Sequence, residues 1–199
     1  MRKSILPLLF ATTLLMGCAN ETPSSSSNEN TPSSETTTGD GKTLVAFFSA
    51  TGTTRKIGNM ISSHLGATTF EIQPADPYTS SDLNYNNSSS RVSTEHNDPN
   101  RHVELVSDSP EDFESYSTIF IGYPIWWGIA AWPVDDFVKN NDFSGKTVVP
   151  FATAASSGMG NSVSLLKEMN NTGNWLEGKM FRSSSSENDV ASWVDSLNL

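Results

Sequence analysis

Hydroxyl side chains and a glycine gather in one short stretch, between an apolar run and a helix-like pattern. The stretch reads Ser49, Ala50, Thr51, Gly52, Thr53 and Thr54. Hydroxyls and the backbone amides that open a helix bind anions such as phosphate, and glycine permits the tight turn. A simple helix cap also favours Ser and Thr, but it needs one hydroxyl rather than four. The stretch therefore predicts a phosphate site, although it matches neither GxxxxGK[ST] nor GxGxxG.

Two adjacent tryptophans follow a second apolar run. The residues after Tyr123 are Pro124, Ile125, Trp126, Trp127 and Gly128. One indole could be buried in a core, but adjacent side chains diverge, so both are harder to bury together. A flat aromatic ligand would cover one of them. We therefore expect ligand contact here, and we expect Gly128 to leave the neighbouring peptide free to reorient.

Small residues dominate a third stretch, 153–160, which includes Thr153, Ala154, Ala155 and Gly158. Short side chains leave the backbone exposed, which suits close approach by the edge of a ring. Any turn from a strand to a helix can have this composition, so the stretch carries weight only together with the other two.

Alternating elements must position these three stretches. Apolar runs predict strands, and apolar residues at helical spacing predict helices. The expected strands are 43–48, 68–72, 117–122, 146–152 and 175–182. The expected helices are 54–65, 110–115, 132–139, 161–169 and 188–197. The alternation predicts an α/β fold, a five-stranded parallel sheet with helices on both faces. Ligands of such sheets bind at the carboxyl ends of the strands, where the three stretches lie.

Together, the three stretches resemble the flavodoxin-like FMN-binding family over residues 42–199. Ser-x-Thr-Gly-x-Thr at 49–54 is similar to the family's phosphate loop, and Trp127-Gly128 resembles its aromatic-glycine pair. "YPIWWG" and "FATAASSGMGNS" look closest to a bacterial branch of flavodoxins that are often lipoproteins. The resemblance implies that loop 49–54 holds the FMN phosphate and that Trp127 packs on a face of the isoalloxazine ring. It also implies that backbone groups of loops 123–129 and 153–160 form hydrogen bonds with the edge of that ring.

The chain departs from this pattern in its third loop. Flavodoxins usually bring a tyrosine from that loop onto the second face of the flavin, yet 153–160 contains no aromatic residue. The segment 74–109 is too long for a plain connection. We hypothesise that it covers the flavin edge, with Tyr85 or Arg91 near the ring. The alternative, a surface excursion without a role, stays open on equal terms.

The N-terminus predicts export and lipidation. Residues 1–17 pair Arg2 and Lys3 with a short apolar run, as in a secretory signal peptide. The following Cys18, the single cysteine, completes a sequence that resembles a lipobox. Residues 18–41 are rich in Ser and Thr and predict a disordered tether. We therefore expect an extracytoplasmic domain that a lipid on Cys18 anchors to the bacterial cell membrane.

Composition excludes several classes of function. The formal net charge of −10 leaves no basic stripe for nucleic acid. His64, His96 and His102 lack metal-ligand spacing. A lone cysteine forms no internal redox pair. Any redox chemistry must therefore come from a cofactor.

The sequence predicts a redox flavoprotein that transfers electrons, or reduces a small acceptor, at the outer face of the membrane. Its donor and acceptor are not identified, although NAD(P)H is cytoplasmic and fits this location poorly. The acidic domain should lower the flavin potential and make the protein an electron donor. The alternative is a lipoprotein that binds a phosphorylated ligand without redox turnover, such as a solute-binding or adhesion module.

Overall fold

The computed structural model describes residues 41–199. The predicted signal peptide 1–17, Cys18 and all but the last residue of the predicted tether 18–41 lie outside the described residues. The strands are β1 (Lys42–Phe47), β2 (Thr68–Glu71), β3 (Tyr116–Trp126), β4 (Ile129–Ala130), β5 (Thr147–Thr153), β6 (Asn174–Trp175) and β7 (Lys179–Phe181). The helices are α1 (Thr53–Leu65), α2 (Arg91–Asn97), α3 (Pro133–Asn140), α4 (Ser162–Met169) and α5 (Glu187–Ser196), with a 3₁₀ turn, η1 (Phe113–Ser115).

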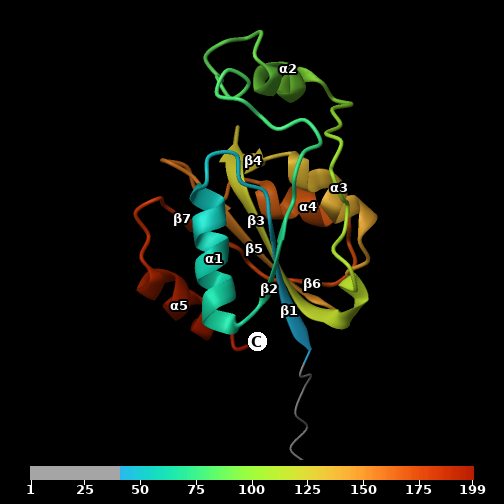
Figure 1. Ribbon diagram of the computed structural model, residues 1–199, viewed down its shortest axis with the longest axis vertical. Helices are drawn as coiled ribbons and strands as arrows, with labels where there is room; N and C mark the ends of the chain where they lie inside the picture. The colour runs from blue at the N-terminus through green and yellow to red at the C-terminus, as the bar shows by residue number, and fades with distance from the viewer. Residues whose placement is uncertain (1–40) are drawn as a thin grey trace, which may run out of the picture. The chain divides into compact units, whose positions relative to one another are not determined.

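A parallel sheet forms the centre of the domain, in the order β2-β1-β3-β5-β6 (Figure 1). β1 pairs with β2 and β3, β3 pairs with β5, and β5 pairs with both β6 and β7, all in parallel. The predicted five-stranded parallel sheet is thus confirmed. Its carboxyl edge is where β1, β3, β5 and β7 end and where the predicted loops begin.

The fifth strand position is divided between β6 and β7. Val148 of β5 pairs with Trp175, and Phe151 pairs with Lys179, so the edge strand has one extra residue between these pairs. Pro150 lies between the two paired stretches and has no N–H to donate to a ladder. The fifth strand predicted within 175–182 is therefore present as two short strands, β6 and β7.

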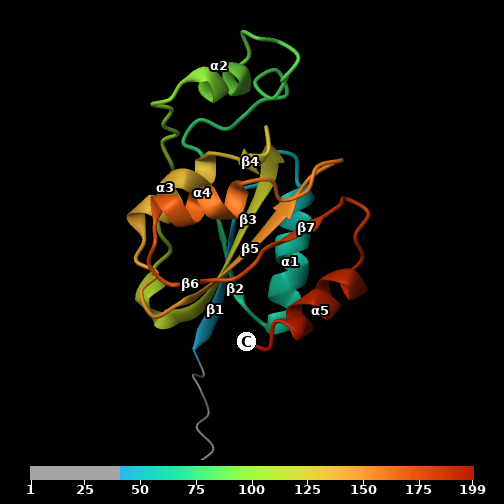
Figure 2. The same cartoon turned by 180° about the vertical axis from the view of Figure 1, so that it is seen from behind.

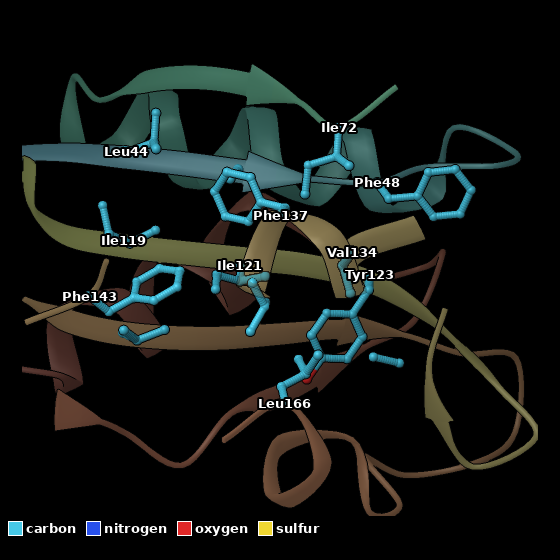
Figure 3. Close-up of a cluster of buried hydrophobic side chains, with 14 of the residues drawn as sticks. Leu44, Phe48, Ile72, Ile119, Ile121, Tyr123, Val134, Phe137, Phe143 and Leu166 are labelled. Atoms are coloured by element: carbon cyan, nitrogen blue, oxygen red, sulfur yellow. The ribbon is translucent and has the colours of Figure 1, made fainter. Parts of the chain in front are cut away.

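Helices cover both faces of the sheet, as predicted (Figures 1 and 2). On one face, α1 and α5 bury Ile57, Ile61 and Val194 against side chains that include Val45. On the other, α3 and α4 form a second cluster with the alternate residues of the same strands, such as Leu44 (Figure 3). Successive strand residues point to opposite faces, so both faces of the central strands are apolar.

Helix α1 packs unusually close to the sheet at Gly58. A Cβ added there would lie 2.6 Å from the Phe47 ring, so only glycine fits without displacing the aromatic side chain. The helix ends at Gly66, whose positive φ of 63° is the common left-handed cap. This packing fixes the amino end of α1 beside the end of β1.

The segment 74–109 contains the main departure from the predicted elements. It includes α2, which the sequence pattern did not predict, and it returns to the domain through an isolated bridge between Pro74 and Leu105. The predicted helix 110–115 is only the short turn η1. Within residues 41–199, no helix has the length and apolar character needed to cross a bilayer.

Candidate functional site

A pocket of about 660 Å³ opens at the carboxyl edge of the sheet, a size typical of small-molecule sites. It is lined by residues from five segments: Ala50, Thr51, Thr53, Leu83, Tyr85, Val92, Pro124, Ile125, Trp126, Trp127, Thr153, Ala154, Ala155 and Ser183. No Asp, Glu, Lys, Arg or His is among them. The pocket is thus lined by apolar side chains and hydroxyls.

The structure brings most of the predicted site residues together in this lining. Five predicted residues do not line it: Ser49, Gly52, Thr54, Gly128 and Gly158. Three lining residues were not predicted, namely Leu83, Val92 and Ser183. Ser183 follows β7, so the rule that ligands bind at carboxyl ends of strands would have found it. Leu83 and Val92 carry no such signal.

The first loop presents helix-terminal amides to the pocket. Gly52 precedes α1 with a φ of 88°, and no side chain caps the helix at this position. The Ser49 hydroxyl instead accepts a hydrogen bond from the backbone N–H of Arg55, at 3.1 Å. The amides of Thr53 and Thr54, in the first turn, have no intrahelical carbonyl to bond. Amides at such a helix terminus are suited to an anion, and the phosphate site predicted here stays a prediction.

The Thr54 side chain has a different partner. Its hydroxyl is buried and lies 2.8 Å from the Thr153 hydroxyl, so it joins the first loop to the third. The Thr54 hydroxyl is therefore engaged in the fold, whereas the hydroxyls of Thr51 and Thr53 belong to residues that line the pocket.

The side chains of Arg55 and Lys56, in the first turn of α1, bond to partners outside the phosphate loop. Arg55 donates from Nε to Glu71 at 3.0 Å and also forms an ion pair with that carboxylate. Lys56 donates to the carbonyl of Ser183 at 3.1 Å. Neither side chain lines the pocket. An anion at this loop would depend on amides, hydroxyls and the helix dipole.

The second loop is the tip of a hairpin between β3 and β4. Trp126 and Ile129 pair across it, and the two residues between them, Trp127 and Gly128, have φ values of 46° and 80°. Two positive φ values in a two-residue loop are the pattern of a type I′ turn. Trp127 is 44% exposed at this tip. Trp126 instead makes an edge-to-face contact with Phe48, at 5.6 Å between ring centroids.

Hydrogen bonds from Arg182 hold the third loop in place. The Arg182 guanidinium donates to the carbonyls of Ala154 and Ser156, each at 3.2 Å. The Ala154 N–H donates in turn to the carbonyl of Phe181, at 3.3 Å. These contacts tie the third loop to the end of β7 and to the residue that follows it.

The segment 74–109 supplies one wall of the pocket through Leu83, Tyr85 and Val92. Tyr85 is 71% exposed, and Figure 1 shows α2 beyond the carboxyl edge of the sheet. Arg91, the second residue hypothesised near a ring, does not line the pocket. It donates to Glu95 at 2.7 Å and to the carbonyl of Asp76 at 2.8 Å.

Glu95 fastens this wall to the domain. Its carboxylate accepts hydrogen bonds from the Tyr78 hydroxyl at 2.6 Å, from Arg91 and, at 2.8 Å, from the indole N–H of Trp132, which directly precedes α3. Burial, followed by the contact with Glu95, raises the pKa of the Tyr78 phenol, so this hydroxyl stays a donor. The wall is thus held by a charge-assisted network rather than by chain connectivity alone.

The described residues offer no metal centre. In the range 41–199, no three or more His, Cys, Asp and Glu side chains are grouped to hold an ion. His64 pairs with Asp195 at 2.6 Å, and His102 pairs with Asp136 at 2.7 Å.

Comparison with known proteins places the chain in a family. The model of the family described as Flavodoxin matches residues 42–197. A candidate flavoprotein from Bacteroides eggerthii is 41% identical, with a TM-score of 0.74, over 80% of this chain and 99% of that chain. A second, from Bacteroides uniformis, is 39% identical, with a TM-score of 0.73, over 78% and 98%.

A flavoprotein from Lactobacillus acidophilus, solved in complex with FMN, shares the fold. It is 23% identical, with a TM-score of 0.57, over 80% of this chain and 99% of that chain. No curated protein matches the chain. The family match covers the whole of the described sheet and its carboxyl-edge loops, so this chain belongs to the flavodoxin family, whose members bind FMN.

Proposed function

We propose that the pocket binds FMN and that the protein is a redox flavoprotein. The observation that carries this proposal is that one pocket joins two unlike surfaces. Unpaired amides open α1 at one of them, and Trp126 and Trp127 form an apolar aromatic surface at the other. FMN has the matching parts, a phosphate and a flat ring, within one molecule.

The residues of the pocket fit FMN although no charged side chain lines it. The amides of Thr53 and Thr54 and the hydroxyl of Thr51 would hold the phosphate with the help of the α1 dipole. Trp127 would pack on the ring, and Ala154 and Ala155 also line the pocket. Bound FMN would supply the redox chemistry that these side chains lack.

The electrostatics of the chain favour electron donation. With a net charge of −10, the protein disfavours additional negative charge in the pocket, which lowers the reduction potential expected for the cofactor. No carboxylate, ammonium, guanidinium or imidazole lines the pocket, so protons that accompany reduction would come from solvent.

The proposed location is the outer face of the bacterial cell membrane. It rests on the signal-peptide pattern of residues 1–17 and on the proposed lipid at Cys18. There the protein would transfer electrons between membrane-associated partners or reduce a small organic acceptor. Labelling with radioactive palmitate tests the anchor, because Cys18→Ser should abolish labelling and release the protein from membranes.

A visible spectrum of the purified full-length protein tests the cofactor, followed by titration of the apo form with FMN. We expect flavin absorption bands and binding at micromolar FMN or below. Parallel titrations with riboflavin and inorganic phosphate separate the two surfaces, since each ligand carries one part only. Absence of flavin binding would overturn the proposal, and equal affinity for phosphate and FMN would favour a site for phosphorylated ligands generally.

A further inference from the structure

The carbonyl of Gly128 at the hairpin tip is already engaged. It accepts a hydrogen bond from the backbone N–H of Asn161, at 2.9 Å, just before α4 begins. Gly128 is not among the lining residues, although its neighbour Trp127 is. The peptide beside the proposed ring is thus bonded to the start of another element, whereas the sequence predicted that it is free to reorient.

Gly160 makes this contact possible. A Cβ at position 160 would lie 2.0 Å from the Gly128 carbonyl oxygen and 2.8 Å from its carbon, both backbone atoms that cannot yield. Gly160 also has a φ of 56°, a conformation that side chains disfavour. The close approach and the positive φ independently require glycine at this position.

We propose that Gly160 and the backbone N–H of Asn161 position the Trp127 wall by holding the Gly128 carbonyl. We name Gly128, Gly160 and Asn161 the Gly128 latch. This inference rests on the proposed FMN site. The latch keeps the Gly128 carbonyl turned toward Asn161 in the free protein and while FMN binds.

The physical reason is the cost of opening the latch. If the carbonyl turned toward the pocket, the Asn161 N–H would lose its partner at the start of α4. Trp127 is meanwhile confined by its positive φ and by the imidazole that stacks on it, His96. The wall is therefore formed before a ligand arrives, which reduces the ordering that binding requires.

Gly160→Ala tests the latch, with Gly66→Ala as its matched control. Gly66 has a similar φ of 63° but no atom within 4 Å of an added Cβ, so it reproduces the backbone strain without the clash. We expect Gly160→Ala to weaken FMN binding about tenfold or more. We also expect it to shift the NMR resonance of the Trp127 indole N–H in the apo protein. Gly66→Ala should change neither. An unchanged indole signal and FMN affinity in Gly160→Ala would overturn the proposal.

Amide hydrogen exchange of Asn161 in the wild-type protein gives a second test, which does not depend on the variant folding. We expect this amide to be protected in the apo and FMN-bound protein alike. Loss of protection on binding would show that the carbonyl leaves Asn161 and would overturn the latch. If the wild type binds no FMN, the proposed function fails. The Trp127 indole resonance and the Asn161 amide exchange in the apo protein would still test whether the latch exists.

Discussion

The imidazole of His96 lies flat against the indole of Trp127, with ring centroids 4.4 Å apart and planes inclined by 10°. His96 belongs to α2, in the segment that the sequence left open as a possible cover. Its Nδ1 is buried and has no hydrogen-bond partner among the described residues, so the ring contributes by packing rather than by a polar contact. The segment therefore supports the wall of the pocket as well as forming part of it.

Replacing His96 should therefore weaken the proposed cofactor site. We expect His96→Ala to raise the FMN dissociation constant roughly two- to tenfold, because an aromatic pair contributes about 0.5–1.5 kcal/mol. His96→Phe should retain most of the affinity. The control is His102→Ala, whose imidazole is 69% exposed and lies away from the lining. Quenching of flavin fluorescence measures the affinities, and equal values for His96→Ala and His102→Ala would contradict the prediction.

Tyr85 tests whether the segment 74–109 covers the flavin. We expect Tyr85→Ala to weaken FMN binding and to change the reduction potential, because the exposed phenol lines the pocket without being held in a core. Tyr85→Phe keeps the ring and should behave as the wild type. A titration and a potentiometric measurement on both variants are required. If both quantities stay unchanged in Tyr85→Ala, the ring does not contact the cofactor.

The hydroxyl pair of Thr54 and Thr153 should stabilise the fold. Thr54→Val keeps the shape of the side chain but leaves the buried Thr153 hydroxyl without its partner, so we expect a loss of about 1–3 kcal/mol in the free energy of unfolding. The double variant Thr54→Val with Thr153→Val should recover part of this loss. Urea denaturation measures Thr54→Val, Thr153→Val and the double variant. Strictly additive losses would show that the two hydroxyls do not interact.

Asp135 should make the stability depend on pH. Burial raises its pKa from 3.8 to about 6, so between about pH 4 and pH 6 the folded state holds more protons than the unfolded state. The free energy of unfolding should fall as pH rises through this window, by about 2–3 kcal/mol. Asp135→Asn should lack this fall and be more stable than the wild type at pH 7.

Asp142→Asn is a control, because Asp142 should affect the pH dependence of stability in the opposite direction to Asp135. Hydrogen bonds from Ser144 lower the pKa of Asp142, so this carboxylate contributes stability above its unfolded pKa and loses it as pH falls. Thermal denaturation from pH 4 to pH 8 compares each variant with the wild type. If the Asp135→Asn curve runs parallel to the wild-type curve, burial does not govern this carboxyl group.

Local sequence patterns predicted the sheet well because its central strands are apolar on both faces. The runs at 43–48, 117–122 and 146–152 became β1, β3 and β5 within a few residues. The carboxyl-edge rule then placed three loops together correctly, since parallel strands end at one edge. Helix α2 escaped prediction because it buries little apolar surface, chiefly Val92, and depends on contacts made through Glu95.

Side-chain roles within the loops could not be predicted in the same way. Thr51 and Thr54 look alike in the sequence, yet one lines the pocket and the other bonds Thr153, which is far along the chain. Nothing near Arg182 in the sequence indicates that it holds the carbonyls of Ala154 and Ser156.

By itself, the sequence determined the order of strands and helices and the chemical character of the loops, because periodicity and residue type act locally. The tertiary structure alone decided which donors stay free, which face of Trp127 is covered and which peptide is bonded at Gly128. Those outcomes depend on partners from distant segments, and a hydrogen bond or an aromatic stack exists only when both partners have been brought within reach.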